Sequence, residues 1–279
     1  MYLGVDVGGT KTLVATLDGH GVITEKVRFP TPATYDEFLR QLKSTIANLK
    51  ADDFQTGGLA IPGEIDREHG RVLWLGNLPG WSPHLPLHVL SDVEKIADCP
   101  MVLENDAKLG GLSEAMLRKD KFSKVLYVTV STGIGTALIS DGAIDTAFGD
   151  GGGRTLLLEH RDKMVPWESF ASGHAIVERY HHKAMEIEDP NTWRKICRDL
   201  AKGLIELIAI TDPEVVVIGG SVGVYFSRYG KILTAELKKY HLPLMPIPPL
   251  QAARRPEEAV VYGCYDLAKQ VYGHARAHS

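Results

Sequence analysis

Tyr2-Leu-Gly-Val-Asp-Val-Gly-Gly-Thr-Lys-Thr-Leu-Val-Ala-Thr-Leu-Asp18 decides the fold of this chain, because it reads as two β-strands joined by a glycine turn. A second copy of the device is Val125-Leu-Tyr-Val-Thr-Val-Ser-Thr-Gly-Ile-Gly-Thr-Ala-Leu-Ile-Ser-Asp-Gly142. Small residues in both turns let backbone amides approach a phosphate group. The first copy adds a carboxylate, Asp6, and a cation, Lys11. Two such hairpins predict a nucleotide held between two lobes.

Composition and charge are those of an ordinary globular protein. The chain has 279 residues, of which 44% are hydrophobic and 24% charged, enough for two lobes. A net charge of -4 gives no field that would gather nucleic acid. No apolar run approaches the ~20 residues that a membrane span needs. We therefore expect a cytoplasmic protein that binds neither nucleic acid nor membrane.

Strand and helix signals alternate along the chain, which predicts an α/β protein. The first lobe is expected over residues 1–115 together with a C-terminal helix over 260–279, and the second lobe over 116–259. A long helix is expected over Thr192–Ile210. The Pro-rich stretch from His241 to Leu250 is interpreted as a surface connection that enters an edge strand.

Seven short motifs, in order along nearly the whole chain, resemble those of the ROK family of sugar kinases, which includes bacterial glucokinases. They are Asp6-Val-Gly-Gly-Thr-Lys11, Ile61-Pro-Gly-Glu-Ile-Asp66, Asn77-Leu-Pro-Gly-Trp81, Glu104-Asn-Asp-Ala107, Ser131-Thr-Gly-Ile-Gly135, Glu168 before Ala171-Ser-Gly173, and Asp212-Pro-Glu-Val-Val-Val-Ile-Gly-Gly220. The resemblance implies an actin-like, ribonuclease-H-like fold of two lobes, with the active site in the cleft between them. It also implies ATP as co-substrate and phosphoryl transfer to a sugar hydroxyl.

Asp106 is the candidate catalytic residue. A sugar hydroxyl is a weak nucleophile, so a kinase needs a carboxylate that accepts its proton. Asp106 would begin a helix directly after the strand Met101–Glu104, and the alternative is that it only caps that helix. The resemblance implies sugar contacts from a further set of residues, namely Gly63, Asn77, Asn105 and Glu168, although Glu168 could also be the start of a surface helix.

The phosphate groups are expected to meet backbone amides in three turns. Asp6 would bind Mg²⁺ through its carboxylate, the alternative being a solvated turn residue. The candidate ATP and phosphate contacts are Gly8, Gly9, Thr10 and Lys11 in the first turn, Thr132 and Gly133 in the second, and Gly219 and Gly220 in the third.

Two departures from the family pattern carry consequences. The histidine and cysteine cluster that binds structural zinc in some members is missing here, so no zinc site is expected. Between Phe148 and Glu159, where the family presents a Glu and a His to the sugar, this chain has three consecutive glycines. The candidates that could substitute are Asp150, Arg154 and Thr155. Nearby His160 is interpreted as a surface histidine.

The sequence therefore predicts an ATP-dependent hexose kinase, with glucose phosphorylated at the 6-hydroxyl as the first expectation. The alternatives are a polyphosphate-dependent kinase, a kinase of fructose or an N-acetyl amino sugar, and a non-catalytic sugar-binding member of the family. The expected ligands are a sugar and a nucleotide with Mg²⁺, and a homodimer is left open. DNA binding is not expected, because Asp6 lies too near the start for a helix-turn-helix to precede it.

Overall fold

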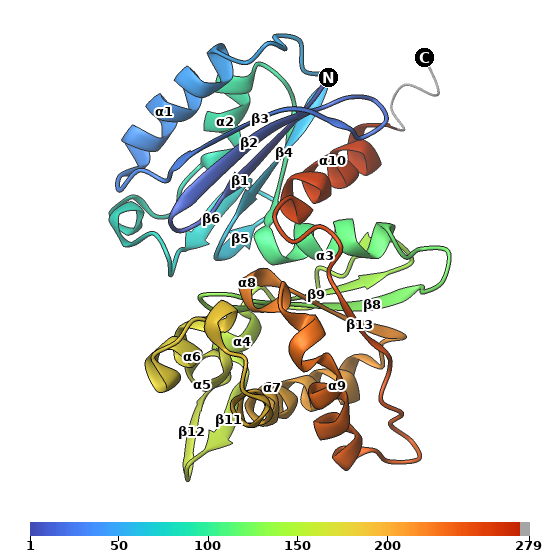
Figure 1. Cartoon of the computed structure of the whole chain (residues 1–279). Helices are drawn as coiled ribbons and strands as arrows, with labels where there is room; N and C mark the ends of the chain where they lie inside the picture. The colour runs from blue at the N-terminus through green and yellow to red at the C-terminus, as the bar shows by residue number, and fades with distance from the viewer. Residues whose placement is uncertain (274–279) are drawn as a thin grey trace. The chain divides into compact units, whose positions relative to one another are not determined.

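The computed structural model describes residues 1–273 and divides the chain into two compact units (Figure 1). Unit 1 contains Met1–Ser113 and the chain from Glu258 onward, and unit 2 contains Glu114–Glu257. The C-terminal helix, α10, runs over Ala259–Tyr272. The part of this helix that was expected over 274–279 lies outside the described residues.

A five-stranded sheet forms the centre of unit 1, in the order β3-β2-β1-β4-β7. Its strands are β1 (Tyr2–Val7), β2 (Lys11–Leu17), β3 (Ile23–Pro30), β4 (Thr56–Ile61) and β7 (Met101–Asn105). The first three pair antiparallel, whereas β1, β4 and β7 run parallel. Because parallel strands point the same way, the carboxyl ends of β1, β4 and β7 meet at one edge of the sheet.

Helices cover both faces of this sheet, with α1 and α2 on one side and α10 on the other (Figure 1). The remaining elements of unit 1 are α1 (Tyr35–Ala47), α2 (Val89–Ala97), α3 (Asp106–Met116, which continues into unit 2), the hairpin of β5 (Glu64–Asp66) and β6 (Arg71–Trp74), and the 3-10 helix η1 (Pro79–His84). Leu3, Val5 and Val7 alternate toward the core shared with α1 and α2. On the opposite face, a Cβ at Gly58 would lie 2.6 Å from Cβ of Cys264, so glycine lets α10 lie directly on β4.

Unit 2 repeats this sheet, in the order β10-β9-β8-β13-β14. Its strands are β8 (Lys124–Val130), β9 (Ile134–Ser140), β10 (Ala143–Ile144), β13 (Val215–Gly219) and β14 (Leu250–Ala252), beside a hairpin of β11 (Leu157–His160) and β12 (Lys163–Pro166). The pairing directions also match those of unit 1, because β8, β13 and β14 run parallel and the other pairs antiparallel. The two glycine hairpins therefore occupy equivalent places, and the Pro-rich stretch enters the edge strand β14, as predicted.

Helices α7 and α9 cover one face of the second sheet. The helices of unit 2 are α4 (Gly152–Thr155), α5 (Glu168–Ala171), α6 (Gly173–Tyr180), α7 (Pro190–Thr211), α8 (Gly220–Gly223) and α9 (Phe226–Leu237), with 3-10 helices η2 (Ala184–Glu186) and η3 (Lys238–Tyr240). Trp193 of α7 stacks on Tyr229 of α9, with ring centroids 4.6 Å apart. The long helix begins two residues earlier than predicted, because Asp189 caps it and Pro190 suits its first position.

A buried ion pair lies where the chain passes from unit 1 into unit 2. Glu114 and Arg118 are 0% and 2% exposed, and Arg118 Nη1 lies 2.5 Å from Glu114 Oε2. The Glu114 carboxylate also accepts the backbone N–H groups of Arg254 and Arg255, at 2.9 and 2.7 Å. Arg118 in turn donates to the carbonyl of Ala252, at 2.8 Å. The end of α3 is thereby joined to the segment that precedes the return to unit 1 at Glu258.

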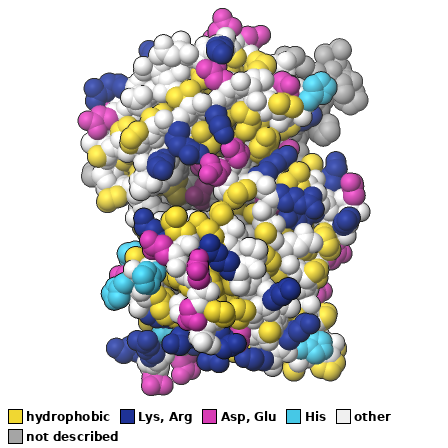
Figure 2. All heavy atoms as spheres, in the orientation of Figure 1, with side chains coloured by type: hydrophobic (Ala, Val, Ile, Leu, Met, Phe, Trp, Pro, Cys, Tyr) yellow, Lys and Arg dark blue, Asp and Glu magenta, His cyan; other side chains and the backbone are white. Residues whose placement is uncertain are grey.

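Charged side chains of both signs are interspersed across the face shown in Figure 2, in keeping with the small net charge. The three cysteines, Cys99, Cys197 and Cys264, are free and buried. Within residues 1–273, no helix combines the length and the apolar character that crossing a membrane requires.

Candidate active site

Two carboxylates lie at the carboxyl edge of the sheet in unit 1. Asp6 lies near the end of β1, and Asp106 is the first residue of α3, directly after β7. Burial raises the pKa of Asp6 to about 7, the negative charge of Asp106 acts in the same direction, and Arg28 opposes both. The structure therefore brings the predicted metal ligand and the predicted base into one electrostatically coupled pair.

Asn105 is the residue that caps α3. Its side-chain Oδ1 accepts the N–H groups of Ala107 at 3.0 Å and Lys108 at 3.4 Å, the two bonds of an N-cap. Asp106 Oδ1 accepts the Ala107 N–H, at 2.8 Å. The alternative reading of Asp106 as nothing more than a helix cap loses its force, because the neighbouring residue performs that function.

Asn105 also connects the helix start to the turn after β4. Its Nδ2 donates to the carbonyl of Gly63 at 3.1 Å. Gly63 has a φ of +115°, and a Cβ there would lie 2.0 Å from the carbonyl oxygen of Trp74, so only glycine fits. Glu104 is buried and paired with Arg67, and its Oε1 accepts the Asn105 N–H at 2.6 Å. Three predicted residues, Gly63, Asn105 and Asp106, therefore lie together on a rigid support.

The first glycine turn is closed by backbone bonds. The Gly8 N–H donates to the carbonyl of Lys11 at 2.9 Å, and Thr31 Oγ1 donates to the carbonyl of Gly8 at 2.8 Å. A Cβ at Gly9 would lie 2.9 Å from Cβ of Asn77, which places Asn77 against the turn. Thr10 and Lys11 are exposed. The predicted phosphate turn and the Asn77 motif are therefore neighbours, as a joint ligand site requires.

In unit 2, the second and third predicted turns adjoin one cavity of about 360 Å³. Thr132 lines it from the β8–β9 turn, and Ser221 lines it directly after Gly219 and Gly220. Gly220 has a φ of +78°, and a Cβ there would lie 2.4 Å from the carbonyl oxygen of Val130, so the turn depends on glycine. The sequence did not predict the rest of the lining of this cavity. It comes mainly from α6 and the segment after it, namely His174, Val177, Lys183, Ala184, Met185 and Tyr225.

Glu168 lies beside the second glycine turn. Its Oε2 accepts the Ile134 N–H at 3.2 Å, and its Oε1 accepts from Arg154 Nε at 2.9 Å. Of the candidates for the altered segment, Arg154 bonds to Glu168, whereas Thr155 is exposed and its hydroxyl donates to the carbonyl of Gly152. No sequence pattern links residues 154 and 168, which belong to different helices.

His160 is not the surface histidine that the sequence suggested. Its side chain is 16% exposed and its ring stacks on Phe170, with centroids 4.2 Å apart. It lies at the end of β11, where the following turn folds it back over α5. Burial lowers its pKa, an effect that the nearby Asp199 opposes.

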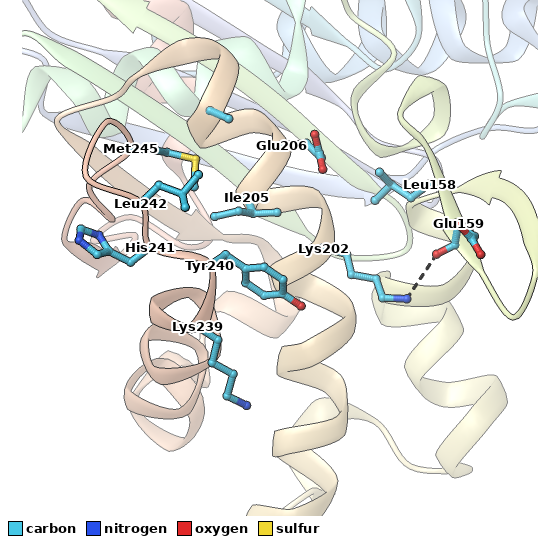
Figure 3. Close-up of a pocket in the computed structure, with 11 residues that line it drawn as sticks. Leu158, Glu159, Lys202, Ile205, Glu206, Lys239, Tyr240, His241, Leu242 and Met245 are labelled. Atoms are coloured by element: carbon cyan, nitrogen blue, oxygen red, sulfur yellow. Dashed lines mark hydrogen bonds between the residues drawn. The ribbon is translucent and has the colours of Figure 1, made fainter.

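A larger cavity of about 540 Å³ lies elsewhere in unit 2, between α7, the β11 strand and the chain after α9 (Figure 3). Ile205, Tyr240, Leu242 and Met245 give it an apolar wall, and Lys202 donates to the carbonyl of Glu159 at its rim, at 3.3 Å. None of the residues that the sequence predicted for the site lines this cavity. The larger of these two cavities is therefore not the one that the predicted site residues line.

The carboxylate pair of unit 1 suits a hard divalent cation. Carboxylate oxygens are the ligands that Mg²⁺ prefers, and the pKa of Asp6 is raised first by burial and then by the negative charge of Asp106, which a cation would offset. Among the side chains that the structure describes, those of residues 1–81 and 85–273, no group of three or more His, Cys, Asp or Glu is arranged to hold a metal. An ion at Asp6 would therefore take most of its ligands from phosphate and water, which is common for Mg²⁺.

Comparisons with known proteins agree over the whole chain. Residues 2–155 and 162–271 match the model of the ROK family. The N-acetylmannosamine kinase of Salmonella typhi is 29% identical over 96% of this chain and 98% of its own length. Among solved structures, the ROK hexokinase of Thermus thermophilus superposes with a TM-score of 0.77 at 26% identity, over 98% of this chain and 99% of that one.

The fold is shared with further members. The ROK glucokinase of Streptomyces griseus, solved with glucose and AMPPNP, superposes with a TM-score of 0.81 at 23% identity, over 96% of this chain and 99% of that one. The predicted fold class, the two-lobed actin-like fold of sugar kinases, is thereby confirmed. With its motifs, its repeated sheet and the match of the family model in agreement, this chain belongs to the ROK family.

Proposed function

We propose that this protein is a sugar kinase that transfers the γ-phosphoryl group of ATP to a hydroxyl of a hexose, with Asp106 as the general base. The observation that carries the proposal is the pair of Asp6 and Asp106 at the carboxyl edge of β1 and β7, with the cap of α3 supplied by Asn105. The two carboxylates suit two roles. Asp106 would accept the proton of the sugar hydroxyl, and Asp6 would bind the Mg²⁺ that accompanies ATP.

The reaction follows from these positions. As the sugar oxygen forms its bond to the γ-phosphorus, its proton passes to a carboxylate oxygen of Asp106, and the bond from phosphorus to the ADP oxygen breaks. Asn105 has one amide N–H beyond the bond to Gly63, and this group orients the hydroxyl. Mg²⁺, when bound beside Asp6, supplies positive charge to the phosphates. The Lys11 ammonium and the Gly9 amide would stabilise the negative charge that develops on the transferred group, whereas the Gly8 N–H is used within the turn by its bond to the Lys11 carbonyl.

We assign ATP as the phosphoryl donor because of the cavity in unit 2. About 360 Å³ lies within the range of small-ligand pockets, and two glycine-containing turns adjoin it. The backbone of Thr132 and Gly133 would meet phosphate oxygens, and Gly219 and Gly220 would meet the nucleoside. Polyphosphate has no nucleoside to fill this cavity, so ATP is the donor that uses both turns.

The acceptor is a hexose or an N-acylated hexosamine. Glucose is the expectation from the resemblance, and Glu168, Gly63 and Asn77 are the further residues that we assign to the sugar. The full-length relatives include kinases named for N-acetylmannosamine, so family membership does not single out glucose. We propose a dimer and a cytoplasmic location on the same grounds of resemblance.

The decisive experiment measures ADP release with glucose, mannose, fructose, N-acetylglucosamine and N-acetylmannosamine, with ATP and with polyphosphate as donors. Asp106→Asn keeps the shape of the side chain and removes the proton acceptor, so the rate should fall by about 10²–10⁴-fold. Asp120→Asn, in the exposed loop after α3, is the matched control.

Retention of more than about a tenth of the rate in Asp106→Asn would place the base elsewhere. Sugar binding without any phosphoryl transfer would identify a non-catalytic member of the family. A polyphosphate rate above the ATP rate would contradict the assignment of the donor.

A further inference from the structure

Arg67 lies one residue beyond the second family motif, at the start of the turn between β5 and β6. Its guanidinium makes two bonds to Glu104, the last residue but one of β7. Nε donates to Oε2 at 2.8 Å, and Nη2 donates to Oε1 at 2.5 Å. Two charge-assisted bonds between the same two groups fix their orientation as well as their distance. The pair therefore joins the β5–β6 hairpin to the end of β7.

The Glu104 carboxylate carries this constraint to the backbone of the next residue. Its Oε1, which accepts from Arg67, also accepts the Asn105 N–H at 2.6 Å. The candidate base Asp106 follows one peptide bond later, as the first residue of α3. A rotation of the backbone at Asn105 would turn the Asp106 carboxylate away from its position. One carboxylate oxygen therefore links the guanidinium to the backbone directly before the base.

A second bond joins the same two segments. Asn105 Nδ2 donates to the carbonyl of Gly63 at 3.1 Å, and Gly63 is the residue before β5. Residues 63–67 are thus held at both ends by two consecutive residues of β7, Asn105 at one end and Glu104 at the other. Without the Arg67 bonds, this segment would be held at one end only. The Asn105 amide would then lose part of the support that fixes its orientation.

Burial gives Arg67 a second effect, on charge. The side chain of Glu104 is 4% exposed, whereas that of Arg67 is 27% exposed. A buried carboxylate without a counter-ion is strongly unfavourable, so Arg67 balances the charge of Glu104 as well as fixing its position. The two effects can be separated, because a neutral side chain at residue 104 removes the need for the charge and does not restore the bonds to the hairpin.

Arg71, four residues further on, is a matched comparison within the same hairpin. Its Nε and Nη2 donate to Asp66 Oδ2 at 3.2 and 2.5 Å, and its side chain is 28% exposed. These bonds join the last residue of β5 to the first residue of β6. Arg71 therefore has the exposure and the pairing of Arg67, but its bonds to Asp66 stay within the hairpin.

We infer that Arg67 is a positioning residue of the acceptor site, which holds Asn105 and Asp106 toward the sugar hydroxyl through the carboxylate of Glu104. The inference rests on the proposed function, because it assumes that Asn105 orients the hydroxyl and that Asp106 accepts its proton. The effect of Arg67 concerns the acceptor. The cavity assigned to the nucleotide is lined by residues of unit 2, so KM for ATP should not depend on Arg67.

The first test measures kcat and KM for the best sugar acceptor and KM for ATP. Arg67→Met should lower kcat/KM for the sugar by roughly ten- to a hundredfold, the scale of a small displacement in an active site, and leave KM for ATP unchanged. Arg67→Lys keeps the charge but loses the planar fork of donors, so it should recover only part of the loss. Arg71→Met is the control and should leave the sugar kinetics unchanged.

The double variant Arg67→Met with Glu104→Gln separates positioning from charge balance. No unpaired charge remains buried in it, so its melting temperature should recover relative to Arg67→Met alone. Its kcat/KM for the sugar should stay low, because the bonds to the hairpin are still missing. Recovery of both quantities would show that Arg67 only stabilises the fold, and the inference would be overturned. If Arg67→Met alone does not fold, Arg67→Lys and the double variant supply the same comparison.

Calorimetric titration without nucleotide, using glucose, mannose, fructose and the two N-acetylhexosamines, separates failure of the inference from failure of the proposed function. If a sugar binds but none is phosphorylated, and Arg67→Met weakens that binding while Arg71→Met does not, the kinase proposal fails and the role of Arg67 stands. The inference is overturned if Arg67→Met leaves the sugar kinetics and binding intact, if Arg71→Met has the same effect, if KM for ATP rises as much as KM for the sugar, or if no sugar binds at all.

Discussion

Replacing Glu114 by Gln should strongly destabilise the protein, because it breaks the buried ion pair with Arg118 and weakens the bonds to the backbone before Glu258. The carboxylate accepts bonds on both oxygens, from Arg118 Nη1 and from the backbone N–H groups of Arg254 and Arg255. A glutamine amide has only one acceptor oxygen, so at least one of these donors would face an NH₂ group. The side chain of Arg118 is only 2% exposed, so its positive charge would be buried without a counter-ion.

The magnitude follows from this burial. Removing one partner of a buried pair costs about 3–5 kcal/mol, whereas an exposed pair contributes about 0–1 kcal/mol. At about 2–4 °C per kcal/mol, the melting temperature should fall by roughly 6 °C or more. The control is Glu178→Gln, which removes the 65%-exposed partner of His174 and should change stability by less than about 1 kcal/mol.

Urea denaturation followed by circular dichroism and by Trp fluorescence measures both variants and reveals any departure from two-state unfolding. In a double-mutant cycle with Arg118→Met, the second substitution should cost less than it does alone, because no unpaired charge remains. A loss below about 1 kcal/mol in Glu114→Gln, or strict additivity in the cycle, would refute this reasoning.

Two further predictions concern metal and pH. Activity should require Mg²⁺, because the phosphates need a hard cation. It should persist in the presence of zinc chelators, because the sequence lacks the histidine and cysteine motif that binds zinc in some family members. Stoichiometric zinc in an elemental analysis of the purified protein would contradict this second expectation. Burial lowers the pKa of His160, so below its ordinary value of 6.5 the unfolded state binds the proton more readily and stability should fall as pH falls. His160→Phe keeps the stack on Phe170 and should flatten that pH dependence, whereas parallel curves for both proteins would assign it to other groups.

The sequence predicted the parts of this fold that depend on neighbouring residues. Alternating β-branched residues around glycine pairs identify both hairpins, and a polar residue directly after a buried strand locates Asp106 at a helix start. The pattern could not separate Asn105 from Asp106 as the cap, since both are common there. Only the bonds from Asn105 Oδ1 to two N–H groups of α3 decide between them.

Contacts between distant segments could not be predicted. Glu114 and Arg118 have the spacing of a helical ion pair, but their partners at Arg254 and Arg255 lie about 140 residues away. The partly buried position of His160 at the end of β11 could not be predicted either, because Phe170 of α5 determines its environment. The bond from Arg154 to Glu168 likewise depends on how closely α4 approaches β9, a property of packing that no local periodicity encodes.

The position of α10 has a consequence for the order in which this protein is made. Synthesis proceeds from the N-terminus, so all of unit 2 leaves the ribosome while the face of β4 that contains Gly58 still waits for Ala259–Tyr272. On that face Gly4 and Gly58 let the helix lie close, and the apolar side chains of Leu13, Ala15 and Leu17 on β2 stay uncovered until Val261 and Tyr265 of the helix pack on them. The first unit to begin emerging is therefore the last to be completed.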